Sequence, residues 1–204
     1  MRIRAMAFPL RAAAAAALLA LPSCAPLIVG GVAATAATSV AQERSTRDAL
    51  DDIETQVAIN NALLNESGAL FSGVNIGVNE GRVLLTGSAP SPAEAARAVE
   101  IARAQRGARE VIDELQPTSR SYGAIAEDAW ITAQVRARLV TEAGADSVDY
   151  NIETYDGVVF LLGTTQSRST LSRAVSAASK VPGVKRVVSH VLTIDDPRRK
   201  GPAA

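Results

Sequence analysis

One sequence feature constrains the fold more than any other: an internal repeat with an offset of 76 residues. Residues from about 53 to 116 reappear at about 128 to 194 without a gap. A repeat that keeps one register over this length predicts two copies of one small folded unit. The matched positions are mostly glycines and aliphatic residues, and they include Gly81 with Gly157, Leu85 with Leu161, Gly87 with Gly163, Gly107 with Gly183 and Val111 with Val187.

Both units show the same predicted order of elements, αββαβ, with helical spacing and strand alternation of the apolar residues. The first strand leads into a tight turn at Glu80-Gly81 or Asp156-Gly157, and Asp-Gly favours a two-residue hairpin because both residues can adopt positive φ. The expected class is α+β, in which each three-stranded sheet is covered by two helices. The expected elements are helices over 53–64 and 128–141, strands over 74–78, 83–87 and 158–163, helices over 91–107 and 168–183, and strands over 110–115 and 185–194.

Residues 1–24 have the pattern of a bacterial lipoprotein signal peptide. Three arginines accompany an apolar stretch, Leu10 to Leu21, that is too short for a comfortable transmembrane helix. The stretch ends at Leu21-Pro22-Ser23-Cys24, which resembles a lipobox, although Pro22 departs from the usual residue there. Cys24 is therefore the expected lipidation site. The alternative is an ordinary secretory peptide cut later, for instance after Ala41, which would release a soluble periplasmic protein.

The segments outside the repeat are predicted to connect or to end the two units. Ala25 follows the candidate cysteine, and the absence of an aspartate there indicates the outer membrane as the destination. Residues 25–52 are rich in alanine, glycine, threonine and serine, which is typical of a linker. Residues 117–127 are predicted as a short second linker, and the tail over 195–204 is predicted to be disordered.

The helix predicted over 128–141 has two apolar stripes, where a soluble domain needs one. At 100° per residue, Ile131, Val135 and Leu139 form an ordinary core face. The second stripe lies on the opposite side, and an outward tryptophan beside an arginine is typical of a helix that meets a membrane surface or a partner. The alternative is that the tryptophan packs beneath the neighbouring domain. The candidate phospholipid-binding residues are Trp130, Ala133, Arg136, Ala137 and Val140.

Charge distinguishes the two units. The formal charge is −3 over 53–116 and +1 over 128–194, and the first helix has the polar residues Glu54 and Asn61 where the second has Trp130 and Ala137. The second unit is therefore the candidate partner of an anionic lipid surface. The whole chain has a formal charge of +0, so no global field attracts nucleic acid and no nucleic-acid partner is expected.

The sequence contains no recognisable catalytic constellation. Its one histidine, His190, lies in a predicted strand without an accompanying nucleophile elbow and is expected to be a packing or rim residue. A single cysteine excludes an internal disulfide and a cysteine-based zinc cluster, and the acidic residues lack metal-loop spacing. We therefore expect no enzymatic activity, no metal and no cofactor.

Two segments make a family resemblance specific: residues 81–87, GRVLLTG, and residues 181–187, VPGVKRV. Both units resemble BON domains, which occur in bacterial periplasmic and outer-membrane proteins. With the lipobox and the linker over 25–52, the whole chain resembles the dual-BON outer-membrane lipoproteins of Gram-negative bacteria. This resemblance implies binding of anionic phospholipid through the second domain, and an association with the division site, with outer-membrane integrity and with the regulation of peptidoglycan-cleaving amidases.

The expected function is that of a non-enzymatic, lipid-anchored protein on the periplasmic face of the outer membrane, which binds anionic phospholipid through its second unit and supports envelope integrity. The alternative is a periplasmic scaffold that docks a protein partner and thereby regulates an envelope or peptidoglycan-remodelling enzyme. Dependence of binding on anionic lipid would separate the two. The sequence leaves the oligomeric state open.

Overall fold

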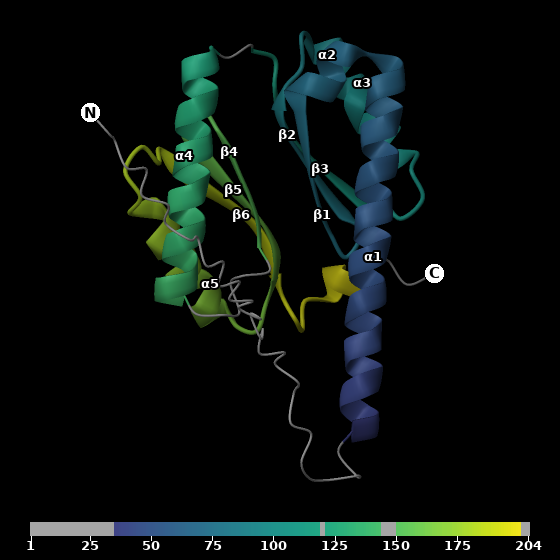
Figure 1. The fold of residues 1–204 in the computed structure, drawn as a ribbon, viewed down its shortest axis with the longest axis vertical. Coiled ribbons are helices and arrows are strands. Elements are labelled where there is room, and N and C mark those ends of the chain that lie inside the picture. Colours follow the sequence, from purple (N-terminus) through teal and green to yellow (C-terminus); the bar gives the residue numbers. More distant parts are fainter. Residues whose placement is uncertain (1–34, 119–120, 144–149, 201–204) are drawn as a thin grey trace, which may run out of the picture.

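The computed structural model describes residues 35–118, 121–143 and 150–200. It confirms the α+β class, with two units built alike (Figure 1). The first unit consists of α1 (Thr35–Glu66), α2 (Gly68–Gly73), β1 (Val74–Asn79), β2 (Arg82–Ser88), α3 (Pro92–Arg103) and β3 (Glu110–Gln116). The second consists of α4 (Tyr122–Arg138), a π-helical turn η1 (Leu139–Ala143), β4 (Asn151–Tyr155), β5 (Val158–Thr165), α5 (Arg168–Ser179), β6 (Arg186–Thr193) and a 3₁₀ turn η3 (Pro197–Lys200).

Each sheet has its second strand in the centre, with the strand orders β1-β2-β3 and β4-β5-β6. The first two strands of each sheet are antiparallel, and the third is parallel to the second. A helix therefore connects the two parallel strands and packs on the sheet. In β2, Val83 and Leu85 face this helical layer, whereas Leu84 faces the opposite side of the sheet.

The two hairpin turns have the predicted conformation, because both central residues of each turn have positive φ: 52° and 72° at Glu80 and Gly81, and 49° and 72° at Asp156 and Gly157. An aspartate on the first helix of each unit, α1 or α4, holds the turn of that unit. Asp52 accepts hydrogen bonds from the amides of residues 80 and 81 at 2.7 and 2.8 Å, and Asp128 accepts the equivalent pair at 2.8 Å each. The repeat therefore extends to this polar contact between helix and turn.

The first helix of each unit is longer than the sequence pattern predicts. Helix α1 begins at Thr35, so the part of the expected linker over 35–52 is helical. Helix α4 begins at Tyr122, within the expected linker over 117–127, because the Ser121 hydroxyl accepts the Ala124 amide as an N-cap. The short helix α2 was not expected. Its own cap, Ser67, accepts two backbone amides in the same way.

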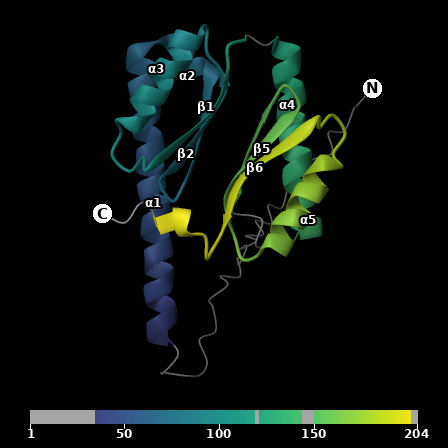
Figure 2. The same ribbon diagram turned by 180° about the vertical axis from the view of Figure 1, so that it is seen from behind.

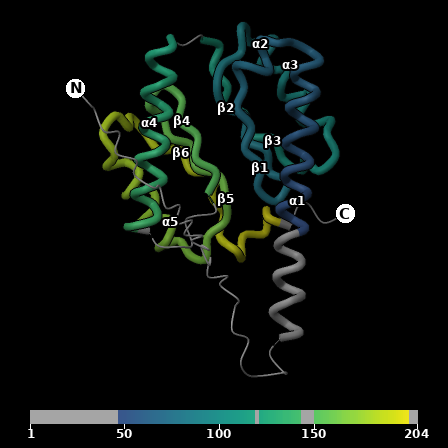
Figure 3. Tube along the Cα trace, viewed as in Figure 1, coloured from purple at the N-terminus to yellow at the C-terminus, as the bar shows by residue number. Residues whose placement is uncertain are grey.

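The two sheets pack against each other through the faces that the helices leave uncovered (Figures 1 and 2). Leu84 of β2 joins Phe160 and Leu162 of β5 and Tyr155 of β4 in one buried cluster. The resulting layers run helices, sheet, sheet, helices, so that α1 and α4 lie on opposite outer sides (Figure 3). The inter-domain contact is thus made by aliphatic and aromatic strand residues. Trp130 is exposed, so the alternative that it packs beneath the neighbouring domain is wrong.

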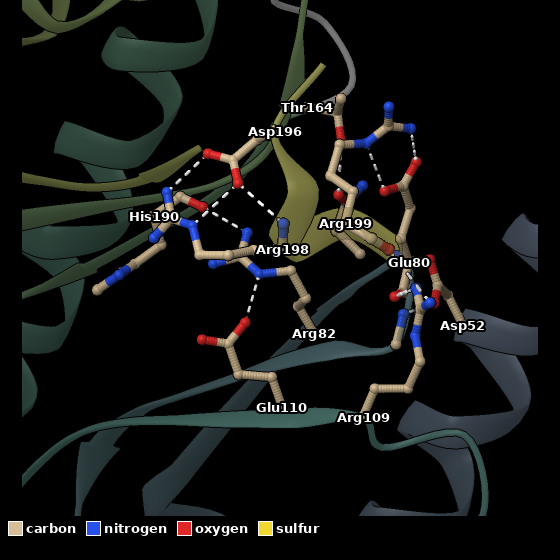
Figure 4. A network of polar contacts seen from close by, with 12 residues as sticks. Asp52, Glu80, Arg82, Arg109, Glu110, Thr164, His190, Asp196, Arg198 and Arg199 are labelled. Carbon is tan, nitrogen blue, oxygen red and sulfur yellow. Dashed lines mark hydrogen bonds and ion pairs between the residues drawn. The ribbon is translucent and has the colours of Figure 1, made fainter. Parts of the chain in front are cut away.

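The segment after β6 is ordered as far as residue 200, in contrast to the disorder expected over 195–204. It carries η3 from the second unit to the first, where Arg199 forms a bidentate ion pair with Glu80 in the β1–β2 turn (Figure 4). Arg109 donates to the Arg199 carbonyl at 3.2 Å, which adds a second link. The predicted disorder was wrong here because the tail arginine has a carboxylate partner across the interface. Residues 201–204 lie outside the described part of the chain.

Polar contacts surround the apolar inter-domain cluster. Arg82 is buried, pairs with Glu110 at 2.7 Å and donates to the His190 carbonyl at 2.6 Å (Figure 4). The His190 Nε2 atom lies 2.9 Å from the Glu114 carboxylate, also across the interface. His190 is therefore a rim residue of the contact between the sheets, as the sequence predicts.

Candidate functional site

Helix α4 carries the candidate surface, and its inner side fixes its orientation. Ile131, Val135 and Leu139 are buried in the core of the second unit, as predicted. Asp128, at the same side of the helix, binds the β4–β5 turn. These contacts leave the opposite side of the helix facing outward.

The predicted outward residues do lie on this exposed side. Trp130 is 51% exposed and Val140 is 49% exposed, and Ala133 and Ala137 between them are also exposed. Because none of the four packs into either domain core, the structure brings the apolar candidates together on one free face. The position of Cys24, the candidate lipidation site, lies outside the described residues.

The free face extends further toward the helix N-terminus than the sequence reasoning assumed. Tyr122 is 93% exposed, and Ile125 and Ala126 are exposed as well. These residues were missed because the helix was expected to begin at residue 128. The signal that could have revealed them is Ser121 as an N-cap, followed by apolar residues at helical spacing. We call the outward set the α4 stripe; it consists of Val140 in the following turn η1 and of five residues of α4, namely Tyr122, Ala126, Trp130, Ala133 and Ala137.

The two arginines near the stripe have different environments. Arg138 donates to the Lys180 carbonyl at 2.9 Å and pairs with Glu142 at 3.3 Å, so its charge is engaged within the domain. Arg136 is exposed on the flank of the stripe. Burial raises the pKa of the Glu153 carboxyl on β4, and the charge of Arg136 partly offsets this rise. Arg136 is thus the basic side chain available beside the stripe.

A cleft of about 1150 Å³ lies between the two units next to this flank. Ile125, Ala129 and Thr132 of α4 form one wall, and Glu153 contributes an acidic group. The first unit contributes mainly small and proline residues, including Pro90 and Pro117. The cleft is open and mixed in polarity, which fits an extended or flexible partner better than a compact apolar ligand.

The equivalent helix of the first unit is more apolar on its outward side than Glu54 and Asn61 alone suggest. Four large apolar residues are exposed on that helix, and the repeat matches them with smaller residues of the second unit: Ala126, Ala129, Ala133 and Val140. The two units therefore share an outward apolar face, with large aliphatic side chains in the first and alanines plus a tryptophan in the second. The four residues of α1, between 50% and 56% exposed, are Leu50, Ile53, Val57 and Leu64.

Within residues 35–118, 121–143 and 150–200, no three His, Cys, Asp or Glu side chains are arranged to hold a metal ion. In the same part of the chain, every helix is too short or too polar to cross a membrane.

Comparison with known proteins places both units in one family. The family model described as "BON domain" matches residues 51–117 and 127–194. An uncharacterised protein of Anaplasma centrale is 38% identical over 70% of this chain and 94% of its own. The outer membrane lipoprotein DolP of Haemophilus influenzae is 31% identical over 86% of this chain and 91% of its own. The osmotically inducible protein Y of Escherichia coli is 30% identical over 71% of this chain and 73% of its own.

Proposed function

The chain belongs to the BON-domain family, and from this premise we propose that it is an outer-membrane lipoprotein that binds anionic phospholipid through the α4 stripe. The observation that carries the proposal is the exposure of Trp130 and Val140 on one free helix face beside Arg136. The similarity to a lipoprotein named for the outer membrane supports the location. Cys24 is the proposed site of the lipid anchor.

The α4 stripe has the properties of an interfacial helix rather than of a membrane-spanning one. An indole ring is amphipathic and partitions to the headgroup region, where its ring is buried and its N–H stays hydrated. The alanines on either side let the helix approach the surface closely, and Val140 adds apolar area at the far end. The indole, the alanines and the valine together would insert shallowly, without a change in fold.

Electrostatics selects the lipid class in this proposal. A basic side chain near an anionic surface contributes about 1 kcal/mol. Arg136 is the flanking charge, and the second unit as a whole has a formal charge of +1 against −3 for the first. One helix face of this size binds weakly alone, so the anchor on Cys24 would act by raising the local concentration of the stripe at the membrane.

A second candidate function is docking of a protein partner, and the cleft beside α4 favours it. Its walls come from both units, so a segment bound there would contact Ile125 of the second unit and Pro90 of the first unit at the same time. Such a protein would be a scaffold of the envelope, and its binding would not depend on anionic lipid.

Vesicle flotation tests the proposal. The chain without residues 1–24 is mixed with vesicles of neutral phospholipid, or with vesicles that also contain an anionic phospholipid, and the floated fraction is measured. We expect flotation with the anionic vesicles only. Trp130→Ala and Arg136→Glu should each reduce the apparent affinity, the latter by about thirtyfold, because it removes one favourable charge and adds a repulsive one, at about 1 kcal/mol each.

Arg103→Glu is the matched control, since it makes the same change in net charge at an exposed position at the end of α3. Equal loss in Arg103→Glu and Arg136→Glu would mean that only the overall charge matters, which contradicts a site on α4. Trp130 is half exposed, so its replacement should lower the free energy of unfolding by no more than about 2 kcal/mol, which is a small part of the stability of a folded domain. A loss of binding would therefore not arise from unfolding.

A further inference from the structure

The outward face of α1 is an exposed apolar seam. We call Leu50, Ile53, Val57, Asn60 and Leu64 the α1 seam. Its four aliphatic residues are each at least half exposed, and Asn60 is partly exposed. Ile59 and Leu63, on the other side of the same helix, are fully buried in the core of the first unit. The seam is therefore additional to the face that the domain needs for its own folding.

The spacing of the α1 seam is that of a coiled coil. Its positions follow one another at intervals of 3, 4, 3 and 4 residues, which is the a-d-a-d-a pattern of a heptad repeat. The α4 stripe lacks this pattern of large residues, since the equivalent positions are mostly alanine. A regular seam of Leu, Ile and Val fits a helical partner with the same repeat, because each side chain can then occupy a hole between four residues of the other helix.

Charge makes an anionic membrane a poor occupant for this seam. Asp51 and Glu54 are exposed on the same stretch of α1, and the first unit has a formal charge of −3. An anionic surface would repel these groups. A second copy of α1 would not repel them. In a parallel pair of helices, Gln56 of one copy meets Asn61 of the other, and Ala49 of one copy meets Glu54 of the other. Each of these flanking pairs contains at most one charge.

We propose that the α1 seam binds a second copy of this chain and forms a parallel, in-register pair of α1 helices. Asn60 determines the orientation. In the parallel register it faces Asn60 of the other copy, so that the two amides can hydrogen-bond to each other. An antiparallel pair centred on Val57 instead sets Asn60 beside Ile53 and Glu54, where its amide lacks this partner. A polar residue in the apolar seam of a coiled coil can fix register and orientation at some cost in stability, and Asn60 is the polar residue of this seam, at a d position.

The size of the seam indicates a weak association. From Leu50 to Leu64 it runs for about 21 Å at 1.5 Å per residue. A pair of helices in contact over this length falls short of the roughly 1,200 Å² that stable interfaces bury. The pair should therefore form where the local concentration is high. Because α1 and α4 lie on opposite outer sides of the molecule (Figure 3), pairing leaves the α4 stripe uncovered, and the two surfaces can be tested separately.

Site-specific photo-cross-linking in cells tests the proposal with the full chain. Two differently tagged copies are co-expressed, and benzoylphenylalanine replaces Leu50 or Val57 in one of them. Asn65 is the matched control position, because it is exposed on the same helix but off the seam. We expect adducts between the two tagged copies from positions 50 and 57, and only background from position 65. Mapping the adduct formed at position 50 should place it near Leu50 of the second copy.

Asn60→Asp provides a variant that sets two like charges against each other in the parallel register. We expect it to reduce the adducts to the background seen at position 65, while the melting temperature by circular dichroism shows that the fold is kept. Asn60→Leu should keep the adducts but allow both orientations, so that position 50 also links near Leu64. Three outcomes would overturn the proposal. The first is that no adducts form between the two copies, and the second is that position 50 or 57 links to phospholipid or to another protein instead. The third is that, with Asn60 unchanged, position 50 links only near Leu64.

Discussion

Replacement of Asp128 by alanine should be among the most destabilising single changes at a polar position of the second unit. The Asp128 carboxylate accepts the amides of Asp156 and Gly157 at 2.8 Å each and thereby joins α4 to the β4–β5 turn. The hydrogen bond of the Gly157 amide is buried. Removal of the carboxylate leaves this amide as an unpaired buried donor, which costs about 1–3 kcal/mol. The Asp156 amide is partly exposed and can bind water, so its loss costs about 1 kcal/mol or less.

The sum is a loss of about 3 kcal/mol in the free energy of unfolding, or roughly 6–12 °C in melting temperature for a folded chain of this size. Asp52→Ala offers a control in the other unit, since Asp52 makes the same two bonds at 2.7 and 2.8 Å. Both of those amides are partly exposed and can bind water when the carboxylate is removed. Burial also raises the pKa of Asp52, which means that its negative charge costs desolvation energy, and alanine removes this cost. We expect a smaller loss for Asp52→Ala, of about 1–1.5 kcal/mol.

Urea denaturation followed by circular dichroism measures both variants, with Asp128→Asn as an intermediate that keeps one acceptor oxygen. The expected order of destabilisation is Asp128→Ala, then Asp128→Asn, with Asp52→Ala no worse than either. A smaller loss of stability in Asp128→Ala than in Asp52→Ala would show that burial of the turn amide does not decide the cost.

Three further predictions concern the interface and the cleft. Phe160→Ala should cost about 3–5 kcal/mol in urea denaturation, because Phe160 is buried between the two sheets; a loss below about 1 kcal/mol would mean that the sheets do not pack there. Arg199→Ala should free the tail from Glu80 and speed its proteolysis, with at most about 1 kcal/mol lost, since the ion pair is partly exposed; unchanged proteolysis would contradict the tail contact. Burial raises the pKa of Glu153, so ionisation of this carboxyl lowers stability as the pH rises through its folded-state pKa. Glu153→Gln should therefore be more stable than wild type at neutral pH but equal to it below the ordinary carboxyl pKa. A variant less stable than wild type at neutral pH would show that the ionised carboxylate stabilises the fold, which contradicts this prediction.

The repeat made the fold predictable from sequence. Because each pattern occurs twice, a turn such as Glu80-Gly81 could be interpreted from its clearer counterpart Asp156-Gly157. The strand and helix order, the core face of α4 and the outward position of Trp130 all follow from local periodicity. These features depend on residues close together in the chain.

The packing of one sheet on the other was not predicted, although a signal was present. The central strands β2 and β5 are continuously apolar, as in Val83-Leu84-Leu85, rather than alternating. A strand of this kind is buried on both faces, and the helices can cover only one. The partner of the second face could not be inferred, because it depends on contacts between residues far apart in the chain, such as Leu84 with Phe160.

The starts of the helices and the fate of the tail were also missed. Helix α1 begins inside an alanine-rich stretch that composition alone assigns to a linker, and α4 begins at a serine cap inside another. The tail is charged and short, and its order depends on Glu80 of the other unit. The α1 seam was not predicted because the first helix was expected to begin at residue 53, which placed Leu50 in the linker and shortened the heptad spacing.

The most direct test of lipid binding by α4 uses the fluorescence of Trp130, the single tryptophan of the chain. The chain without residues 1–24 is titrated with neutral or with anionic vesicles, some of which carry quenchers at a shallow depth in the acyl region. Because Trp130 is half exposed, its emission in buffer should be that of a solvated indole. We expect a blue shift and shallow quenching with anionic vesicles only, and we expect Arg136→Glu to lose both. An unshifted spectrum with vesicles that nevertheless bind the protein would contradict this expectation, because Trp130 would then lie away from the membrane.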